Sequence, residues 1–193
     1  GEITPAYAIL PTSSLQVIHE YYPQLRLLYI LRNPIDRAWS QARMELAKRL
    51  QKSGPMTKQD ESRWLKQQLS SEQSVARGDY AACLERWWKW YPPEFIKIFI
   101  YDEFFATPRA GICECCVFLG GDAKYYHTMT DQTLATVVLP ETELLGLDRA
   151  PLPPHSTPPH INMLLDIYAP KIAILEGLLG RKLSDLWLAR YIQ

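Results

Sequence analysis

The sequence predicts an α/β fold in which helices flank a parallel sheet. Two short apolar runs, at residues 25–31 and 95–101, have the length and the side chains of buried strands. Each run is followed by a residue that can cap a helix and then by a proline, in Asn33-Pro34 and Thr107-Pro108. The order of strand, helix, helix, strand and helix is typical of parallel sheets with crossover helices.

The composition limits the classes of partner. The 193 residues include 21 basic and 21 acidic side chains, and 47% of them are hydrophobic. This length is typical of one domain, and the apolar content is enough for a core. A net charge of zero argues against a broad basic face, so we expect no nucleic-acid partner, and any anion site is built from a few residues. No apolar run reaches the roughly 18 residues that a membrane span needs.

Capping residues predict the first two helices. Ser13 or Ser14 can cap a helix that Pro23 ends. After the first strand, Asn33 caps a second helix, in which apolar residues continue at helical spacing to Leu50. A strand, a short loop and a helix make half of a βαβ unit.

The segment between this helix and the second strand has weaker signals. Residues 51–77 are polar and contain a Gly-Pro break, so we expect the least ordered part of the first half, with an exposed helix at 61–69. Asp79 can cap the next helix, which Pro92 stops. Its aromatic side chains are too many for one buried face, so we expect some of them to be exposed.

Prolines dominate the pattern after the second strand. The helix that opens at Thr107-Pro108 stops at Gly120-Gly121. Residues 123–159 predict irregular structure, and the prolines between 151 and 159 exclude a helix there.

Two short helices are expected near the end of the sequence. Apolar residues recur at helical spacing in 160–168 and in 171–179, and Gly180 stops the second of these helices. We expect residues 183–191 to form a short tail in which Trp187 packs against the rest of the domain.

The four cysteines do not form a metal-binding pattern. Cys113, Cys115 and Cys116 crowd together, whereas Cys83 stands alone, so a second ligand pair for zinc is lacking. The pattern is typical of small apolar residues on a helix, and it provides no disulfide framework. We therefore expect no metal site and a cytoplasmic protein.

The residues from Arg32 to Ser40 have the chemistry of a phosphate site. Arg32 follows a buried parallel strand, at the edge where open α/β sheets bind ligands. A helix then begins, and its free N–H groups and positive dipole end favour an anion. Arginine offers a planar fork of donors to phosphate, and Ser40 adds a hydroxyl.

A purely structural interpretation of the same residues is also open. Arg32 or Arg37 can pair with Asp36, Glu45 or Asp102, and Ser40 is then an ordinary helix residue.

The pattern Leu-Arg-Asn-Pro-x-x-Arg-x-x-Ser after a strand resembles the 3′-phosphate-binding motif of sulfotransferases that use 3′-phosphoadenosine 5′-phosphosulfate. Nearly the whole chain is similar to the bacterial and heparan sulfate branch of that family, in the same order. The other matching segments are Gly1-Glu2-Ile3-Thr4-Pro5-Ala6-Tyr7, Gly78-Asp79-Tyr80 with Leu84 and Trp87 or Trp88, Tyr91-Pro92, residues 98–104 with Pro108, Phe118-Leu119-Gly120, Tyr168-Ala169-Pro170, Leu175, and Leu178-Leu179-Gly180 to Trp187.

The resemblance implies a P-loop-NTPase-like fold and a function. A sulfuryl group would move from 3′-phosphoadenosine 5′-phosphosulfate to a hydroxyl or amine of a small-molecule or carbohydrate acceptor, leaving adenosine 3′,5′-bisphosphate. Arg32 and Ser40 would hold the 3′-phosphate. Tyr101 would lie near the adenine, with simple core packing as its alternative. Arg149 occupies the place of a basic loop, with a free surface arginine as its alternative.

The sequence departs from the family in two places. It has no Lys-x-Gly-Thr-Thr-like loop for the 5′-phosphosulfate, and Ile3 stands where many relatives have a lysine. We therefore expect residues 1–193 to be the carboxyl-terminal portion of one sulfotransferase-like domain, without its first strand and loop. The catalytic base is then expected upstream of Gly1. The alternative is a non-catalytic α/β binding or scaffold module that keeps the fold without the donor loop.

Overall fold

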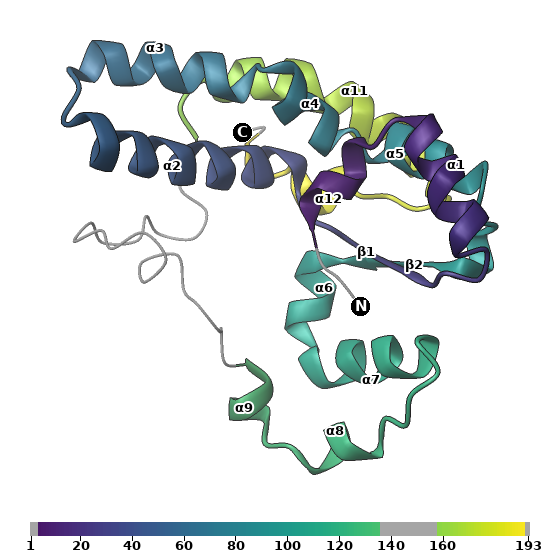
Figure 1. The fold of residues 1–193 in the computed structure, drawn as a ribbon. Coiled ribbons are helices and arrows are strands. Elements are labelled where there is room, and N and C mark those ends of the chain that lie inside the picture. The colour runs from purple at the N-terminus through teal and green to yellow at the C-terminus, as the bar shows by residue number, and fades with distance from the viewer. Residues whose placement is uncertain (1–3, 136–157, 192–193) are drawn as a thin grey trace. The chain divides into compact units, whose positions relative to one another are not determined.

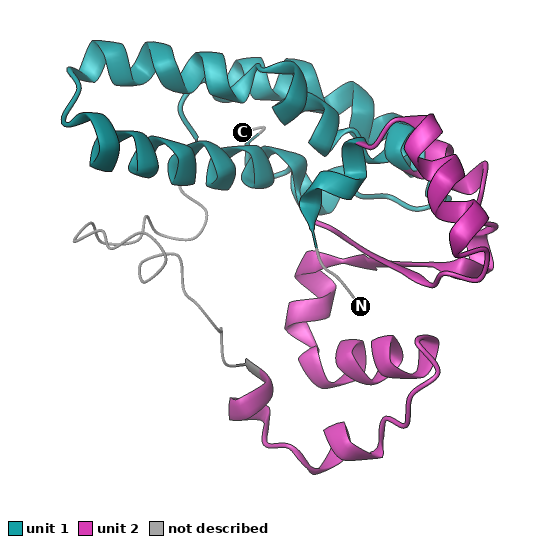
Figure 2. Ribbon diagram, in the orientation of Figure 1, with its two compact units in different colours: residues 1–9, 33–83, 139–193 teal, residues 10–32, 84–138 magenta. Residues whose placement is uncertain are grey.

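The structure is a computed structural model that describes residues 4–135 and 158–191. The chain divides into two compact units built from interleaved segments (Figure 2). Unit 1 comprises residues 1–9, 33–83 and 139–193, and unit 2 comprises residues 10–32 and 84–138.

Unit 2 contains the sheet. Within the described residues, β1 (Leu27–Leu31) and β2 (Ile96–Ile100) form a two-stranded parallel sheet (Figure 1). The register runs from Leu27 opposite Ile96 to Leu31 opposite Ile100. The predicted α/β class and both predicted strands are confirmed.

Two helices pack against β2. They are α6 (Tyr101–Ala106), which the sequence did not predict, and α7 (Pro108–Phe118), which it did. The Phe104 ring meets Phe99 edge-on, with 5.3 Å between the ring centroids. Gly111 allows this packing, because a Cβ atom at that position would lie 2.6 Å from the Phe104 ring.

The segment after α7 corrects one prediction. Residues 124–128 and 131–135 form the short helices α8 (Lys124–Thr128) and α9 (Asp131–Ala135), where irregular structure was expected. Each of these helices has five residues, too few to show the apolar periodicity from which a helix is predicted. The guanidinium of Arg109 on α7 holds them in place, because it donates to the carbonyls of Tyr126 and Met129 at 2.5 and 2.7 Å and pairs with Asp131.

The helices predicted in this part of the chain form, but the predicted cap of the first one is wrong. That helix begins at Thr12, after Pro11, so Ser13 and Ser14 lie inside it and do not cap it. The first predicted helix is α1 (Thr12–Tyr21), and the hydroxyl of Tyr91 donates to the Tyr22 carbonyl just beyond it at 2.8 Å. The single turn η2 (Pro93–Phe95) leads into β2. The helix predicted after Asp79 is α5 (Tyr80–Trp88), which crosses from unit 1 into unit 2. Of its aromatic cluster, Trp87 and Tyr91 are buried, and Trp88 and Trp90 are half-buried.

Unit 1 is a helical layer. The long helix α2 (Pro34–Ser53) packs against α3 (Lys58–Leu69), α4 (Glu72–Gly78) and α11 (Ile161–Leu179), and η1 (Pro5–Ile9) packs against α4. No described helix is long and apolar enough to cross a membrane. The buried side chains of this unit include Ile35, Ala38, Ala42, Leu46, Leu65, Leu69, Leu164, Tyr168, Ile172, Leu175, Leu183 and Trp187.

The expectation for residues 51–77 was wrong in part. Most of this stretch is helical, because Thr57 caps α3 through the Asp60 amide at 3.1 Å and Ser71 caps α4 through the Ser74 amide at 3.3 Å. Leu65 and Leu69 supply the buried contacts of α3. Two apolar positions in a polar stretch gave too weak a periodicity to extend the prediction.

The two helices predicted at 160–168 and 171–179 are one helix, α11, with Pro170 inside it. A proline in a helix interior removes a backbone donor. Tertiary packing outweighs this cost, because the buried residues on both sides of Pro170 lie at helical spacing. The helix ends at Gly180, whose φ of 63° is the left-handed conformation that glycine favours. The buried residues are Leu164, Tyr168, Ile172 and Leu175.

The tail docks as predicted. Trp187, in the short helix α12 (Ser184–Trp187), is 1% exposed. The carboxylate of Glu176 on α11 fastens the start of this helix, because it accepts from the amides of Ser184 and Leu183 at 2.6 Å each. The hydrogen bond from the Ser184 amide, together with that from Leu183 and the charge of Lys182, lowers the pKa of Glu176 to about 2.

Glu176→Gln should lower the melting temperature at pH 7. The folded-state pKa lies below the usual value of 4.5, so the ionised carboxylate stabilises the fold above pH 4.5 and loses this effect as the pH falls toward 2. We expect a loss of about 2 kcal/mol at pH 7, because a charged acceptor becomes neutral. The gap between mutant and wild type should shrink below pH 3. An equal gap at both pH values, or one matched by the exposed control Glu85→Gln, contradicts the assignment.

Gly78→Ala should destabilise the fold. An added Cβ would lie 2.5 Å from the ring of Tyr168, whereas at Gly177, inside α11, nothing lies within 4 Å. Chemical denaturation should show a loss of about 1–3 kcal/mol for Gly78→Ala. The matched change Gly177→Ala should stabilise by about 0.5–1 kcal/mol. Equal effects of the two substitutions would show that the contact with Tyr168 does not constrain position 78.

Candidate phosphate-binding turn

The turn from β1 to α2 is built around a buried asparagine. Asn33 is 2% exposed, and its Oδ1 accepts from the Ile35 amide at 3.0 Å. Its backbone carbonyl accepts from the Arg37 amide, also at 3.0 Å. Pro34 occupies the first helical position. The capping prediction for this helix is therefore confirmed.

Asn33 also ties this turn to the distant tail. Its Nδ2 donates to the backbone carbonyl of Trp187 at 2.6 Å, and both residues belong to unit 1. One side chain thus bonds the first turn of α2 and the docked tail at the same time. Its burial makes both bonds costly to lose, because an unsatisfied amide inside a protein is unfavourable.

Arg32 and Tyr101 lie together in unit 2. Leu31 pairs with Ile100 in the sheet, so the residues after the two strands share one edge. The guanidinium carbon of Arg32 lies 5.0 Å from the centroid of the Tyr101 ring, a cation–π contact. Phe105 also contacts this ring, with centroids 4.5 Å apart. Tyr101 is half-buried at the sheet edge.

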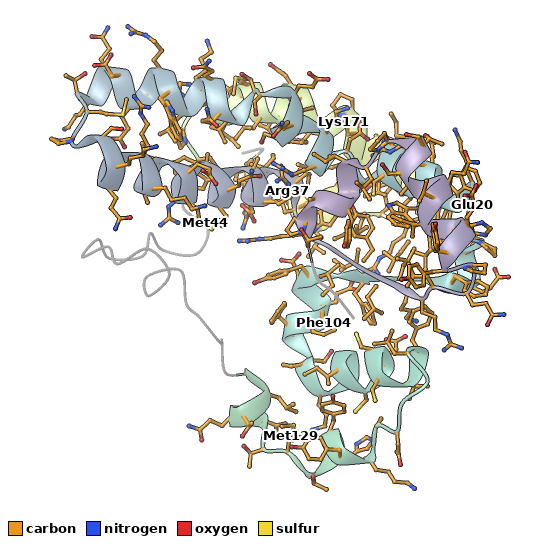
Figure 3. All side chains as sticks on the ribbon, viewed as in Figure 1. Glu20, Arg37, Met44, Phe104, Met129 and Lys171 are labelled. Carbon is orange, nitrogen blue, oxygen red and sulfur yellow. The ribbon has the colours of Figure 1, made fainter. Side chains whose placement is uncertain are left out.

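Ser40 lies on α2 in unit 1 and is half-buried. Arg37, labelled in Figure 3, lies near the start of the same helix. Its guanidinium donates to Oε1 of Gln41 at 2.9 Å and to the Ser74 carbonyl at 2.6 Å. Arg37, the second arginine of the motif, therefore fastens α2 to α4. The alternative in which Arg37 pairs with Asp36 is not what the structure shows.

Asp36 pairs instead with the end of the tail. Its Oδ2 accepts from Nη2 of Arg190, and its Oδ1 accepts from the Tyr191 hydroxyl at 2.6 Å. Nη2 of Arg190 also donates to the Tyr191 hydroxyl at 2.7 Å. Burial, followed by the hydrogen bond to Asp36, raises the pKa of Tyr191 above its usual value. The sequence did not reveal these partners, because they lie more than 150 positions from Asp36.

Arg149 lies outside the described residues. All four cysteines lie within them and are free thiols. Among the described side chains, no three of the kinds that hold metals come together.

The chain is similar to a known family of protein domains. The family model for the sulfotransferase domain matches residues 10–139, which include β1, β2, Arg32 and Ser40. No curated protein matches the chain.

A solved structure of a sulfotransferase from Alicyclobacillus acidocaldarius is similar in fold, with a TM-score of 0.59 and 24% sequence identity. The likeness covers 93% of this chain and 64% of that one, so the chain spans less than two thirds of that protein's length. At this identity the likeness shows the fold alone. The family match itself spans more than half of the chain, so the chain belongs to the sulfotransferase domain family.

Proposed function

We propose that the protein transfers a sulfuryl group from 3′-phosphoadenosine 5′-phosphosulfate to a hydroxyl or amine of a small-molecule or carbohydrate acceptor. The observation that carries the proposal is the position of Arg32, which follows the buried end of β1 directly before α2, inside the region that matches the family. In open α/β sheets this is the edge where ligands bind.

The proposed role of this region is to hold the 3′-phosphate of the donor. The Arg32 guanidinium supplies charged donors, and the Ser40 hydroxyl supplies a further one. The first turn of α2 contributes the positive end of its helix dipole. The contact between Arg32 and the Tyr101 ring limits the orientations of the guanidinium. A guanidinium held in one orientation can present its planar set of N–H donors to a phosphate. Tyr101 is also the proposed neighbour of the adenine.

In the reaction, the acceptor oxygen or nitrogen bonds to sulfur, and the bond from sulfur to the 5′-phosphate oxygen breaks. The acceptor proton passes to a base that we expect upstream of Gly1, and adenosine 3′,5′-bisphosphate leaves. The 3′-phosphate does not react. Arg32 and Ser40 therefore contribute binding energy that orients the donor, and they do not take part in bond changes.

The cysteines support a cytoplasmic location. All four are free thiols in the described part of the chain, as is common where the thiol pool is reduced.

Adenosine 3′,5′-bisphosphate should bind the chain and raise its melting temperature. Calorimetry should show weaker binding for Arg32→Ala and for Ser40→Ala, by roughly 1.5–3 kcal/mol for each lost contact with a charged group. The matched control is Arg63→Ala, because Arg63 on α3 is 73% exposed and pairs with Asp60, three positions away on the same helix. Unchanged affinity in both site variants contradicts the assignment.

A further inference from the structure

A negative charge stands beside the proposed phosphate site. Asp36 lies in the first turn of α2, four residues before Ser40. Side chains four residues apart share one face of a helix, with Cβ atoms about 5–6 Å apart. A bare carboxylate at this place would repel a phosphate bound at the Ser40 hydroxyl. The same carboxylate stabilises α2, because acids are favourable in the first turn of a helix.

Both oxygens of this carboxylate accept hydrogen bonds from the tail. Arg190 bonds Oδ2, and the Tyr191 hydroxyl bonds Oδ1. The side chains of Asp36 and Arg190 are 21% and 28% exposed, so solvent screens their interaction less than it would at the surface. Burial keeps the Tyr191 hydroxyl protonated, because it raises the pKa further above its usual value, so this hydroxyl remains a donor.

The part of the tail before Arg190 is held by buried side chains and by a hydrogen bond from Asn33. Trp187 is buried and its carbonyl is held by Asn33, while Leu183 and Leu188 are 0% and 6% exposed. Nη2 of Arg190 also bonds the Tyr191 hydroxyl, and its guanidinium carbon lies 4.7 Å from the centroid of the Tyr191 ring. The guanidinium is thus placed before any ligand arrives. All these residues belong to unit 1.

We propose that Arg190 is a positioning residue for the donor nucleotide, which acts by neutralising Asp36 so that a phosphate can bind at Ser40. The proposal rests on the function proposed above. Arg190 lies outside residues 10–139, so the match to the family model does not assign it. With the charges of Asp36 and Arg190 cancelled, the Ser40 hydroxyl and the dipole of α2 remain to favour the phosphate.

The test compares two nucleotides that differ by the 3′-phosphate. Calorimetry on the 193-residue chain measures the affinities of adenosine 3′,5′-bisphosphate and adenosine 5′-monophosphate. The proteins compared are wild type, Arg190→Gln, Asp36→Asn and the double variant. We expect Arg190→Gln to weaken binding of the bisphosphate about tenfold, which is about 1.4 kcal/mol. The affinity for the monophosphate should be nearly unchanged. In the double variant, the affinity for the bisphosphate should return to within about twofold of wild type, because no uncompensated charge remains.

Two controls separate this role from simple stabilisation. Arg63→Gln breaks an exposed ion pair of the same unit and should change neither affinity. Arg190→Lys keeps the positive charge and should retain most of the affinity for the bisphosphate. If Arg190→Gln does not fold, the double variant is compared with wild type, and a loss of affinity for the bisphosphate in the double variant overturns the proposal.

The outcomes that overturn the proposal are distinct. A wild-type chain that does not bind the bisphosphate removes both the proposed function and this role. Normal binding by Arg190→Gln removes the role alone. Equal losses for both nucleotides indicate a structural effect. A selective loss that Asp36→Asn does not restore indicates that Arg190 itself contacts the phosphate.

Discussion

The described structure of unit 1 depends on the hydrogen bonds of one buried amide. Asn33 ends the connection from β1, caps α2 through the Ile35 amide, and holds the carbonyl of Trp187. These bonds fix the first turn of α2 and bring the tail to it. Because the side chain is buried, replacing it would leave both partners without their bond. The same turn carries the residues that we assign to phosphate binding.

The charges around this turn suit the anion site that we propose in a neutral chain. The start of α2 contributes the positive end of its helix dipole, and Asp36, the acid in its first turn, is paired with Arg190. Arg37, which the motif also places here, is used to join α2 to α4. Each charged group thus has a separate task, and the net charge of the protein says little about the site.

The sequence could predict what local chemistry determines. The apolar runs predicted both strands, and the Asn33-Pro34 cap predicted where α2 begins. It could not predict α8 and α9, which Arg109 holds by tertiary hydrogen bonds. Nor could it predict the continuity of α11 through Pro170, which packing on one face maintains. The motif predicted Arg32 and Ser40 as candidates, but the partner of Asp36 lies at the other end of the chain.

We propose that the turn from β1 to α2 holds the 3′-phosphate of the donor nucleotide. A crystal structure of the chain with adenosine 3′,5′-bisphosphate tests it most directly. We expect the 3′-phosphate to lie within hydrogen-bond distance of the Arg32 guanidinium and of Oγ of Ser40, with Arg190 still paired to Asp36. A 3′-phosphate bound elsewhere, or one that draws Arg190 away from Asp36, would contradict it.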